Sequence, residues 1–336
     1  LGQAPHRVLQ KLVDWGVLEP HRLAAARPLR QHVKDWKAAL LAKGNTEAHV
    51  ELVVARVNKI IKRCRFRHYA DISASRVQRF LADRRAADNM SAQTSNFHLQ
   101  AAKQFCRWMI LERRASENPL GHLSGVNVRT DRRHDRRALT IEEIHALLQA
   151  AEAGPTRFKT TGPERAMIYR LALETGLRAN EIRSLTRQSF QLDNGSPTVT
   201  VEAGYSKRRR EDVQPLRPAT AILLEQHLAH KMPDAPAFNV PRRTAQMIRA
   251  DLKDAGIPYR NSADRCADFH ALRHTFITNL AQSGAHPSVA QALARHSTIA
   301  LTMNRYTHTI PEQLTDALDK LPDLTAMDCT NSSKSA

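Results

Sequence analysis

The sequence predicts a mainly α-helical protein with a small antiparallel β-sheet, an α+β fold in two domains. Its 336 residues exceed a typical domain of roughly 100–200 residues. Residues 28–115 carry hydrophobic side chains at helical spacing with almost no strand pattern, which indicates a helical domain. Residues 198–201 and 212–216 are typical of short strands on either side of a basic turn, which indicates a β-hairpin in the second half.

The positive charge of the chain is concentrated in its first part. The formal net charge is +18, and residues 1–137 carry 27 Lys and Arg against 12 Asp and Glu, which leaves a net charge of only +3 for the rest. A segment this basic is typical of proteins that bind a polyanion, so nucleic acid is the leading class of partner. The alternative is a basic surface that only keeps the protein soluble.

Composition also excludes several classes of protein. Hydrophobic residues make up 42% of the chain, too many for a disordered protein. No apolar run approaches the roughly 20 residues that span a bilayer, so we expect no membrane partner. The four cysteines are far apart and form no CxxC pair, which argues against a zinc site and a disulfide framework. This usage favours the reducing cytoplasm.

Four helices are expected in a domain at residues 28–119, each from a start signal followed by hydrophobic residues at helical spacing. The start signals are Pro28, Thr46, Ser73 or Ser75, and Ser91. The last helix stops at Asn118-Pro119, because the residue before a proline is biased away from helix. Residues 1–27 have an apolar helical pattern of their own, which we interpret as an arm or a partial element.

The segment 120–138 separates the two predicted domains. It contains five arginines among Asp, Gly and Asn and has no hydrophobic period, so we interpret it as an extended basic linker. The alternative is an exposed loop with scattered charge.

The second domain is predicted at residues 139–325, followed by a polar tail at 326–336. It opens with a capping box formed by Thr140 and Glu143, and a following helix is closed by Gly176. After the hairpin, helices are expected at 219–230, 241–254, 268–282, 287–294 and 300–307, with a last one at 311–320.

Unusual residues gather in four separated segments of this second domain. They are Glu174–Glu181, Lys207 on the hairpin, His270–Thr275, and Ala294–Ser297 with Tyr306 beyond it. On a helix, His270 and Arg273 face one target because they are three residues apart. Two Arg, two His and one Lys around one point repel each other unless an anion binds there. Guanidinium groups match the oxygens of a phosphodiester, so a phosphate group is the predicted anion.

This ordered set resembles the pattern of the tyrosine recombinase, or phage integrase, family. The pattern is an Arg in a TGLRxxE turn, a hairpin Lys, HisxxArg, a His or Trp, and a Tyr nucleophile. The matching positions are Arg178, Lys207, His270, Arg273, His296 and Tyr306. The likeness covers about residues 138–320 by motif, and residues 28–115 resemble the family's helical, SAM-like core-binding domain by pattern alone.

Two details depart from the commonest form of that pattern. Tyr306 follows His296 by one residue more than is usual in the family. Three arginines follow Lys207, which leaves open which basic side chain takes the hairpin role.

The resemblance implies a role for each of these residues. Tyr306 would attack the phosphorus and form a 3′-phosphotyrosyl link, without metal, ATP or any cofactor. Arg178 and Arg273 would stabilise the charge that builds on the phosphate oxygens. His270 would transfer protons, and His296 would hydrogen-bond a non-bridging oxygen.

Three further residues have implied supporting or catalytic roles. Lys207 would protonate the leaving 5′-oxygen, Glu181 would orient Arg178, and His274 is expected to pack behind the site. Without the ordered motif, all these residues would be interpreted as ion-paired arginines, core histidines, a half-buried tyrosine and a solvated turn lysine.

The resemblance further implies a C-shaped clamp, in which a helical core-binding domain and a catalytic domain hold double-stranded DNA recombination sites. The free protein would be a monomer or dimer, and four copies would assemble on two synapsed duplexes in the cytoplasm, at the nucleoid. Basic residues expected to contact DNA are Arg56, Lys59, Lys62, Arg63, Lys103, Arg107, Arg132, Arg133 and Arg208. The implied activity is site-specific recombination. The alternatives are a type IB topoisomerase-like enzyme that relaxes supercoils, and a catalytically silent DNA-binding accessory protein.

Overall fold

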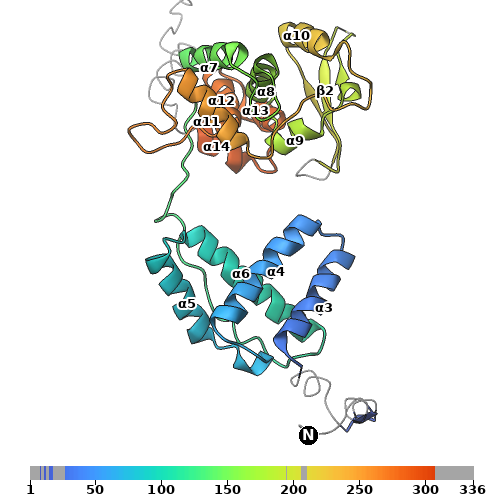
Figure 1. Ribbon diagram of the computed structural model, residues 1–336, viewed down its shortest axis with the longest axis vertical. Coiled ribbons are helices and arrows are strands. Elements are labelled where there is room, and N and C mark those ends of the chain that lie inside the picture. The colour runs from blue at the N-terminus through green and yellow to red at the C-terminus, as the bar shows by residue number, and fades with distance from the viewer. Residues whose placement is uncertain are drawn as a thin grey trace, which may run out of the picture. The chain divides into compact units, whose positions relative to one another are not determined.

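The computed structural model describes residues 27–193, 195–205 and 210–306, together with residues 8, 11, 12 and 15–17. The chain divides into two compact units, Leu1–Arg133 and His134–Ala336 (Figure 1). The described elements are mostly helices, with one three-stranded antiparallel sheet, which confirms the mainly helical fold class with a small sheet. No helix in these described ranges has the length and apolar character needed to cross a membrane.

The first unit is built from helices. They are α3 (Leu29–Ala42), α4 (Glu47–Arg63), α5 (Ala74–Ala87) and α6 (Ala92–Leu111), with a 3-10 turn at Tyr69–Asp71. Two predicted start signals act as hydrogen-bonding caps, because Ser73 Oγ accepts from the backbone N–H of Arg76 and Ser91 Oγ from that of Thr94.

Helices α3, α4 and α6 enclose the hydrophobic core of this unit. Trp36 of α3 meets Phe105 of α6 edge to face, with 5.4 Å between ring centroids, and Val50 and Val57 of α4 are buried in the same core. Each fully buried side chain of this size contributes about 1.5–3 kcal/mol. The apolar spacing that predicted the helices is therefore the spacing that packs them together.

The segment predicted as a basic linker is partly folded onto each unit. Leu120 and Leu123 are buried in the core of the first unit, and Lys103 Nζ donates to the carbonyl oxygens of Gly121 and Leu123. At the other end, Arg137 pairs with Glu143 in the second unit at 2.6 Å. The free energy gained by burying the two leucines exceeds the conformational entropy that an open linker would keep. The charge pattern of the segment does not indicate this burial.

The second unit contains eight of the described α-helices. They are α7 (Ile141–Ala153), α8 (Gly162–Thr175), α9 (Ala179–Ser184), α10 (Pro218–Leu228), α11 (Thr244–Asp254), α12 (Phe269–Gln282), α13 (Pro287–Ala294) and α14 (Ile299–Tyr306). The predicted capping box is present, since Thr140 and Glu143 each accept the other's backbone N–H. Helix α9 lies where the sequence predicts only a turn. Its six residues are too few to show a helical period, so the sequence pattern does not indicate a helix. The helix predicted at 311–320 lies outside the described residues.

The sheet consists of β1 (Phe190–Gln191), β2 (Thr198–Val201) and β3 (Asp212–Pro215), in that order. The β2–β3 ladder places Val199 opposite Gln214 and Val201 opposite Asp212, and both valines are fully buried. This confirms the predicted hairpin. Strand β1 is additional, because two residues are too short to show an alternating pattern.

Helix α12 lies at the centre of the second unit, where it contacts α8, α11, α13 and α14 (Figure 1). Figure 1 shows the sheet at the side of the unit away from α11. The start of α12 is held by Asp268, whose carboxylate accepts the backbone N–H of Ala271 and pairs with Arg136 at 2.8 Å. Helix α12 therefore lies against α8, α13 and α14, which adjoin three of the segments that carry the unusual residues.

Candidate active site

The turn between α8 and α9 presents Arg178. Gly176 closes α8 in the left-handed conformation, with φ of 65°, and a Cβ there would lie 2.6 Å from Cδ1 of Phe276 in α12. Only glycine fits both the dihedral angle and the close approach. The glycine thus lets the chain turn sharply against α12 and brings Arg178 to the start of α9.

Glu181 connects two arginines at this turn. Its Oε1 lies 2.7 Å from Nη1 of Arg178, and its Oε2 accepts both the backbone N–H of Arg178 and Nη2 of Arg295, each at 2.8 Å. Burial alone would raise the pKa of the Glu181 carboxyl. The charge of Arg295 and the hydrogen bonds from Arg178 outweigh burial and hold this pKa below its ordinary value, so Glu181 is ionised.

Arg273 lies beneath the same turn. It is buried, and it donates through Nη1 to the carbonyl oxygen of Gly176 at 2.6 Å and through Nη2 to that of Ala294. Desolvation, and then the charges of Arg178 and Arg295, lower the pKa of Arg273 to about 9. Arg273 therefore stays charged at neutral pH, and it ties α12 both to the Arg178 turn and to the end of α13.

His270 begins the same face of α12 one turn earlier. Burial and the positive charges of Arg136 and Arg273 lower the pKa of His270 to about 4, so its imidazole is neutral at physiological pH. The ring of His274 packs edge to face against it, with 5.3 Å between centroids. A neutral imidazole beside several guanidinium groups is able to accept a proton.

His296 lies between the end of α13 and the start of α14. Its Nδ1 is 2.9 Å from Oγ1 of Thr302, a fully buried residue of α14. This contact attaches α14 to the segment that carries His296. Tyr306 is the last residue of α14, and its side chain lies outside the described part of the structure.

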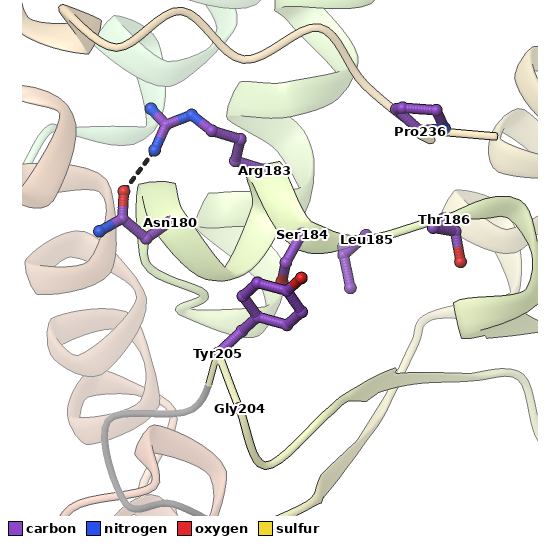
Figure 2. Close-up of a pocket in the computed structure, with 8 residues that line it drawn as sticks. All are labelled: Asn180, Arg183, Ser184, Leu185, Thr186, Gly204, Tyr205 and Pro236. Atoms are coloured by element: carbon purple, nitrogen blue, oxygen red, sulfur yellow. Dashed lines mark hydrogen bonds between the residues drawn. The ribbon is translucent and has the colours of Figure 1, made fainter. Parts of the chain in front are cut away.

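A surface pocket lies between α9 and the base of the hairpin (Figure 2). Figure 2 shows the ring of Tyr205 close to Ser184 and the side chain of Arg183 turned to Asn180, with which it forms a hydrogen bond. Arg183 also donates to the carbonyl oxygens of residues 240 and 241, so α9 is firmly anchored. Lys207 and Arg208, further along the hairpin, lie outside the described residues.

The residues predicted to contact DNA in the first unit differ in their environment. Lys62, Arg63 and Arg107 are exposed, whereas Arg56 and Lys59 are half-buried. Arg56 stacks over the ring of Phe97, at 4.8 Å from its centroid. Lys103 donates to two backbone carbonyl groups, so it has a structural role in the first unit.

The remaining predicted DNA contacts lie at the end of the segment 120–133. Arg132 is exposed. Arg133 pairs with Asp131 and donates through Nη1 to the backbone and side-chain oxygens of Asn89, at 2.6 and 2.8 Å. The guanidinium of Arg133 is therefore engaged within the first unit. In the part of the chain that the structure describes, no three or more His, Cys, Asp or Glu residues are grouped so as to hold a metal ion.

Sequence reasoning missed three residues that shape this site. Arg295 takes part in the Glu181 cluster, and Gln214 of β3 donates through Nε2 to the carbonyl oxygen of Leu293 at 2.8 Å. Arg136 was assigned to a linker, yet it neighbours His270 through Asp268. No local pattern marks these residues, because their partners are 79 to 132 residues away in the sequence.

Comparison with known proteins points to one family. Residues 137–313 match the phage integrase family. The chain is 26% identical over 260 residues to the tyrosine recombinase XerD of Caulobacter vibrioides, which covers 73% of this chain and 79% of that protein. It is 44% identical over 73 residues to a XerC-like tyrosine recombinase of Caldanaerobacter subterraneus, but the match spans only 17% of that protein's length and 22% of this chain.

A solved structure shares the fold. A dimer of lambda integrase residues 75–356 bound to a COC′ core site matches with a TM-score of 0.65 at 16% identity, covering 83% of this chain and 95% of that one. The family match spans more than half of the chain and includes Arg178, Glu181, His270, Arg273, Arg295 and His296. The chain therefore belongs to the phage integrase family and is a tyrosine recombinase, a site-specific enzyme that cleaves and rejoins DNA strands.

Proposed function

We propose that this enzyme recombines DNA by forming a 3′-phosphotyrosyl link through Tyr306, with Arg178, Lys207, His270, Arg273 and His296 as the other catalytic residues. The observation that carries the proposal is the convergence of Arg178, Arg273 and Arg295 around a single carboxylate, Glu181. Three guanidinium groups and one carboxylate leave an excess of positive charge. A scissile phosphodiester is the anion that balances it.

Of the two predicted phosphate-binding arginines, Arg178 is the one with an exposed guanidinium. Arg178 uses Nη1 for Glu181, and 27% of its side chain is exposed, so Nε and Nη2 are the groups that reach the non-bridging oxygens. Arg273 is buried beneath and lies against the turn that carries Arg178. Donors fixed in advance stabilise the charge that develops as Tyr306 attacks, and each such donor is worth on the order of 10²-fold or more in rate.

His270 accepts the proton of the attacking tyrosine. With a pKa of about 4 in the DNA-free protein, it is neutral and ready to act as a base. The negative charge that builds on the phosphate oxygens in the transition state raises the pKa of His270, because it favours the protonated imidazole. The proton transfer and the chemical step are therefore coupled in the same site.

Tyr306 belongs to the helix that His296 fixes. Thr302 contacts His296, and position 306 is one helical turn beyond position 302 on α14. In the reaction, Tyr306 Oη forms a bond to phosphorus while the bond from phosphorus to the 5′-oxygen breaks. A proton from Lys207 makes the leaving group a 5′-hydroxyl. Attack of a second strand's 5′-hydroxyl reverses the step, so rejoining needs no ATP.

The placement of the hairpin supports the role of Lys207. Tyr205 lines the pocket beside α9, and Lys207 follows it by two residues (Figure 2). Arg208 and the two arginines after it would contact neighbouring phosphates.

Double-stranded DNA recombination sites are the proposed substrate, held between the two units in a C-shaped clamp. The first unit supplies exposed basic residues such as Lys62, Arg63 and Arg107. Such phosphate contacts position the protein without reading sequence. Support comes from the lambda integrase structure, which is described as a dimer bound to a core site. We propose that this chain acts in the cytoplasm, on a mobile element, and forms a tetramer on two synapsed duplexes.

The test is a covalent adduct on DNA. Wild-type protein and Tyr306→Phe are incubated without metal with nicked duplexes tiled across the DNA that flanks the gene, because a nick next to the cleavage point traps the intermediate. We expect an SDS-stable adduct in wild type, its loss in Tyr306→Phe, and recombination only between two matching sites. An adduct that persists in Tyr306→Phe, or none on any duplex, contradicts the proposal, and relaxation of supercoils without a paired site supports a topoisomerase instead.

A further inference from the structure

Arg295 occupies a backbone position that ordinarily suits glycine. It ends α13 in the left-handed conformation, with φ of 53°, and only 4% of the residue is exposed. This conformation is sterically unfavourable for a side chain as large as arginine. The side chain must therefore make interactions that hold it there.

The contacts of Arg295 are few and directed at one group. Its Nη2 donates to Oε2 of Glu181 at 2.8 Å, across 114 residues of sequence. Its Nε and Nη1 are buried without a hydrogen-bond partner among the described residues. Buried donors without a partner are rare in native proteins, because they lose their hydration and gain nothing in return.

Arg165 of α8 shows what a purely structural buried arginine looks like in the same unit. All three of its guanidinium nitrogens have partners, in the carboxylate of Asp251 and the carbonyl oxygens of Ala151, Pro155 and Thr160. Arg295 lacks this saturation. Among the described residues, its guanidinium hydrogen-bonds to the carboxylate that also holds Arg178.

Glu181 divides its two oxygens between these arginines. Oε1 contacts the guanidinium of Arg178, while Oε2 is shared by the backbone N–H of Arg178 and the guanidinium of Arg295. A carboxylate held at both oxygens has one orientation. Without Arg295, Arg178 alone holds both oxygens of Glu181, so the carboxylate is able to shift toward the donors of Arg178 that the phosphate needs.

We infer that Arg295 is a positioning residue, which acts through Glu181 to present Arg178 to the scissile phosphate. This inference rests on the proposed function. The guanidinium of Arg295 then acts in the site without contacting DNA, because it is buried beneath the turn. The strained backbone at Arg295 is retained because a glycine there supplies no partner for Glu181.

The experiment compares variants in single-turnover cleavage of the nicked duplex that traps the wild-type adduct. The variants are Arg295→Gly, Arg295→Lys, Glu181→Gln and the double variant Arg295→Gly with Glu181→Gln. We expect Arg295→Gly to slow cleavage on the order of 10²-fold, because a misplaced catalytic group costs about that much. Its Kd for the uncleaved duplex should stay within about threefold of wild type, since the lost interaction acts on the chemical step.

The double variant shows whether the effect passes through Glu181. If it does, the double variant cleaves no more than about twofold slower than Glu181→Gln alone, because residues acting through one contact are not additive. Losses that multiply instead overturn the inference. Arg295→Lys keeps one donor to Glu181 and should recover most of the rate, and a lysine variant as slow as the glycine variant also overturns it.

A backbone control separates positioning from stability. Arg113, two residues beyond the end of α6, has the same φ of 53° but is exposed, so Arg113→Gly shows what relief of this conformation does to the unfolding temperature. Failure of the two proposals is distinguishable. If wild type forms no adduct, the proposed function fails and the role of Arg295 fails with it; if wild type forms one and Arg295→Gly cleaves equally fast, only the role of Arg295 fails.

Discussion

Gly176 lies so close to Phe276 that a Cβ on the glycine would be 2.6 Å from the ring. This contact brings the Arg178 turn against α12, the helix that carries His270 and Arg273. The backbone of Gly176 adds a second requirement, since its φ of 65° is unfavourable for any residue with a side chain.

Gly176→Ala should therefore lower the free energy of unfolding by about 2–4 kcal/mol, from backbone strain together with overpacking against Phe276. Adduct formation should also slow, because the turn that presents Arg178 shifts. Gly284→Ala is the matched control, since Gly284 has φ of 74° with nothing near its Cβ position. It isolates the backbone cost of about 1–2 kcal/mol. Equal losses in the two variants would show that the Phe276 contact is unimportant.

Asp251 should be the most sensitive polar residue of the second unit. It is fully buried and accepts hydrogen bonds from Arg165, Tyr169 and Arg157, at distances of 2.7–3.1 Å. Asp251→Asn removes the charge opposite the buried guanidinium of Arg165, which should cost about 3–5 kcal/mol in urea unfolding. Asp254→Asn breaks only the half-exposed pair with Arg157 and should cost less than about 1 kcal/mol. A similar cost for both variants would contradict a structural role for the buried network.

The features of the fold that could be predicted from the sequence are those set by residues close together in the chain. Ser91 and Thr140 predict helix starts because a cap and its partner are within three residues of each other. The helix at 287–294 has the predicted bounds because Pro287 opens it. Strand β1 and helix α9 are not predicted, because segments of two and six residues are too short to show a hydrophobic period.

The candidate site divides along the same physical line. An ordered motif is enough to nominate Arg178, His270 and Arg273, and the structure brings these three together around the α8–α9 turn. The motif does not identify Arg295, because nothing next to that residue in sequence predicts a left-handed backbone or a carboxylate partner 114 residues away. Long-range ion pairs depend on the completed fold.

His270 should make stability depend on pH. Its pKa is about 4 in the folded protein against 6.5 ordinarily, so between these values the unfolded chain binds a proton that the folded protein does not. The free energy of unfolding therefore rises with pH across this window and levels off above it. Wild type should lose about 1.5 kcal/mol more than His270→Gln between pH 6.5 and 5, measured by chemical denaturation.

A histidine elsewhere in the same unit provides the control for this measurement. His145 is exposed on α7, so His145→Gln should keep the pH dependence of wild type. If His270→Gln and wild type lose stability in parallel over this range, the imidazole is not held neutral by its surroundings.

The contact between His296 and Thr302 should govern the chemical step more than DNA binding. Thr302 is fully buried, and its Oγ1 lies 2.9 Å from Nδ1 of His296. Thr302→Val keeps the shape of the side chain but removes the hydroxyl, so the His296 ring loses this hydrogen bond and α14 loses a polar attachment. Because Tyr306 ends this helix, the rate of adduct formation should fall about 10- to 100-fold. Affinity for the uncleaved duplex should change little.

Thr298→Val, at an exposed position just before α14, is the matched control and should cleave at the wild-type rate. Equal rates in Thr302→Val and wild type would mean that the histidine is oriented by DNA itself, whereas a parallel loss of binding and cleavage would mean that the hydroxyl only supports the fold.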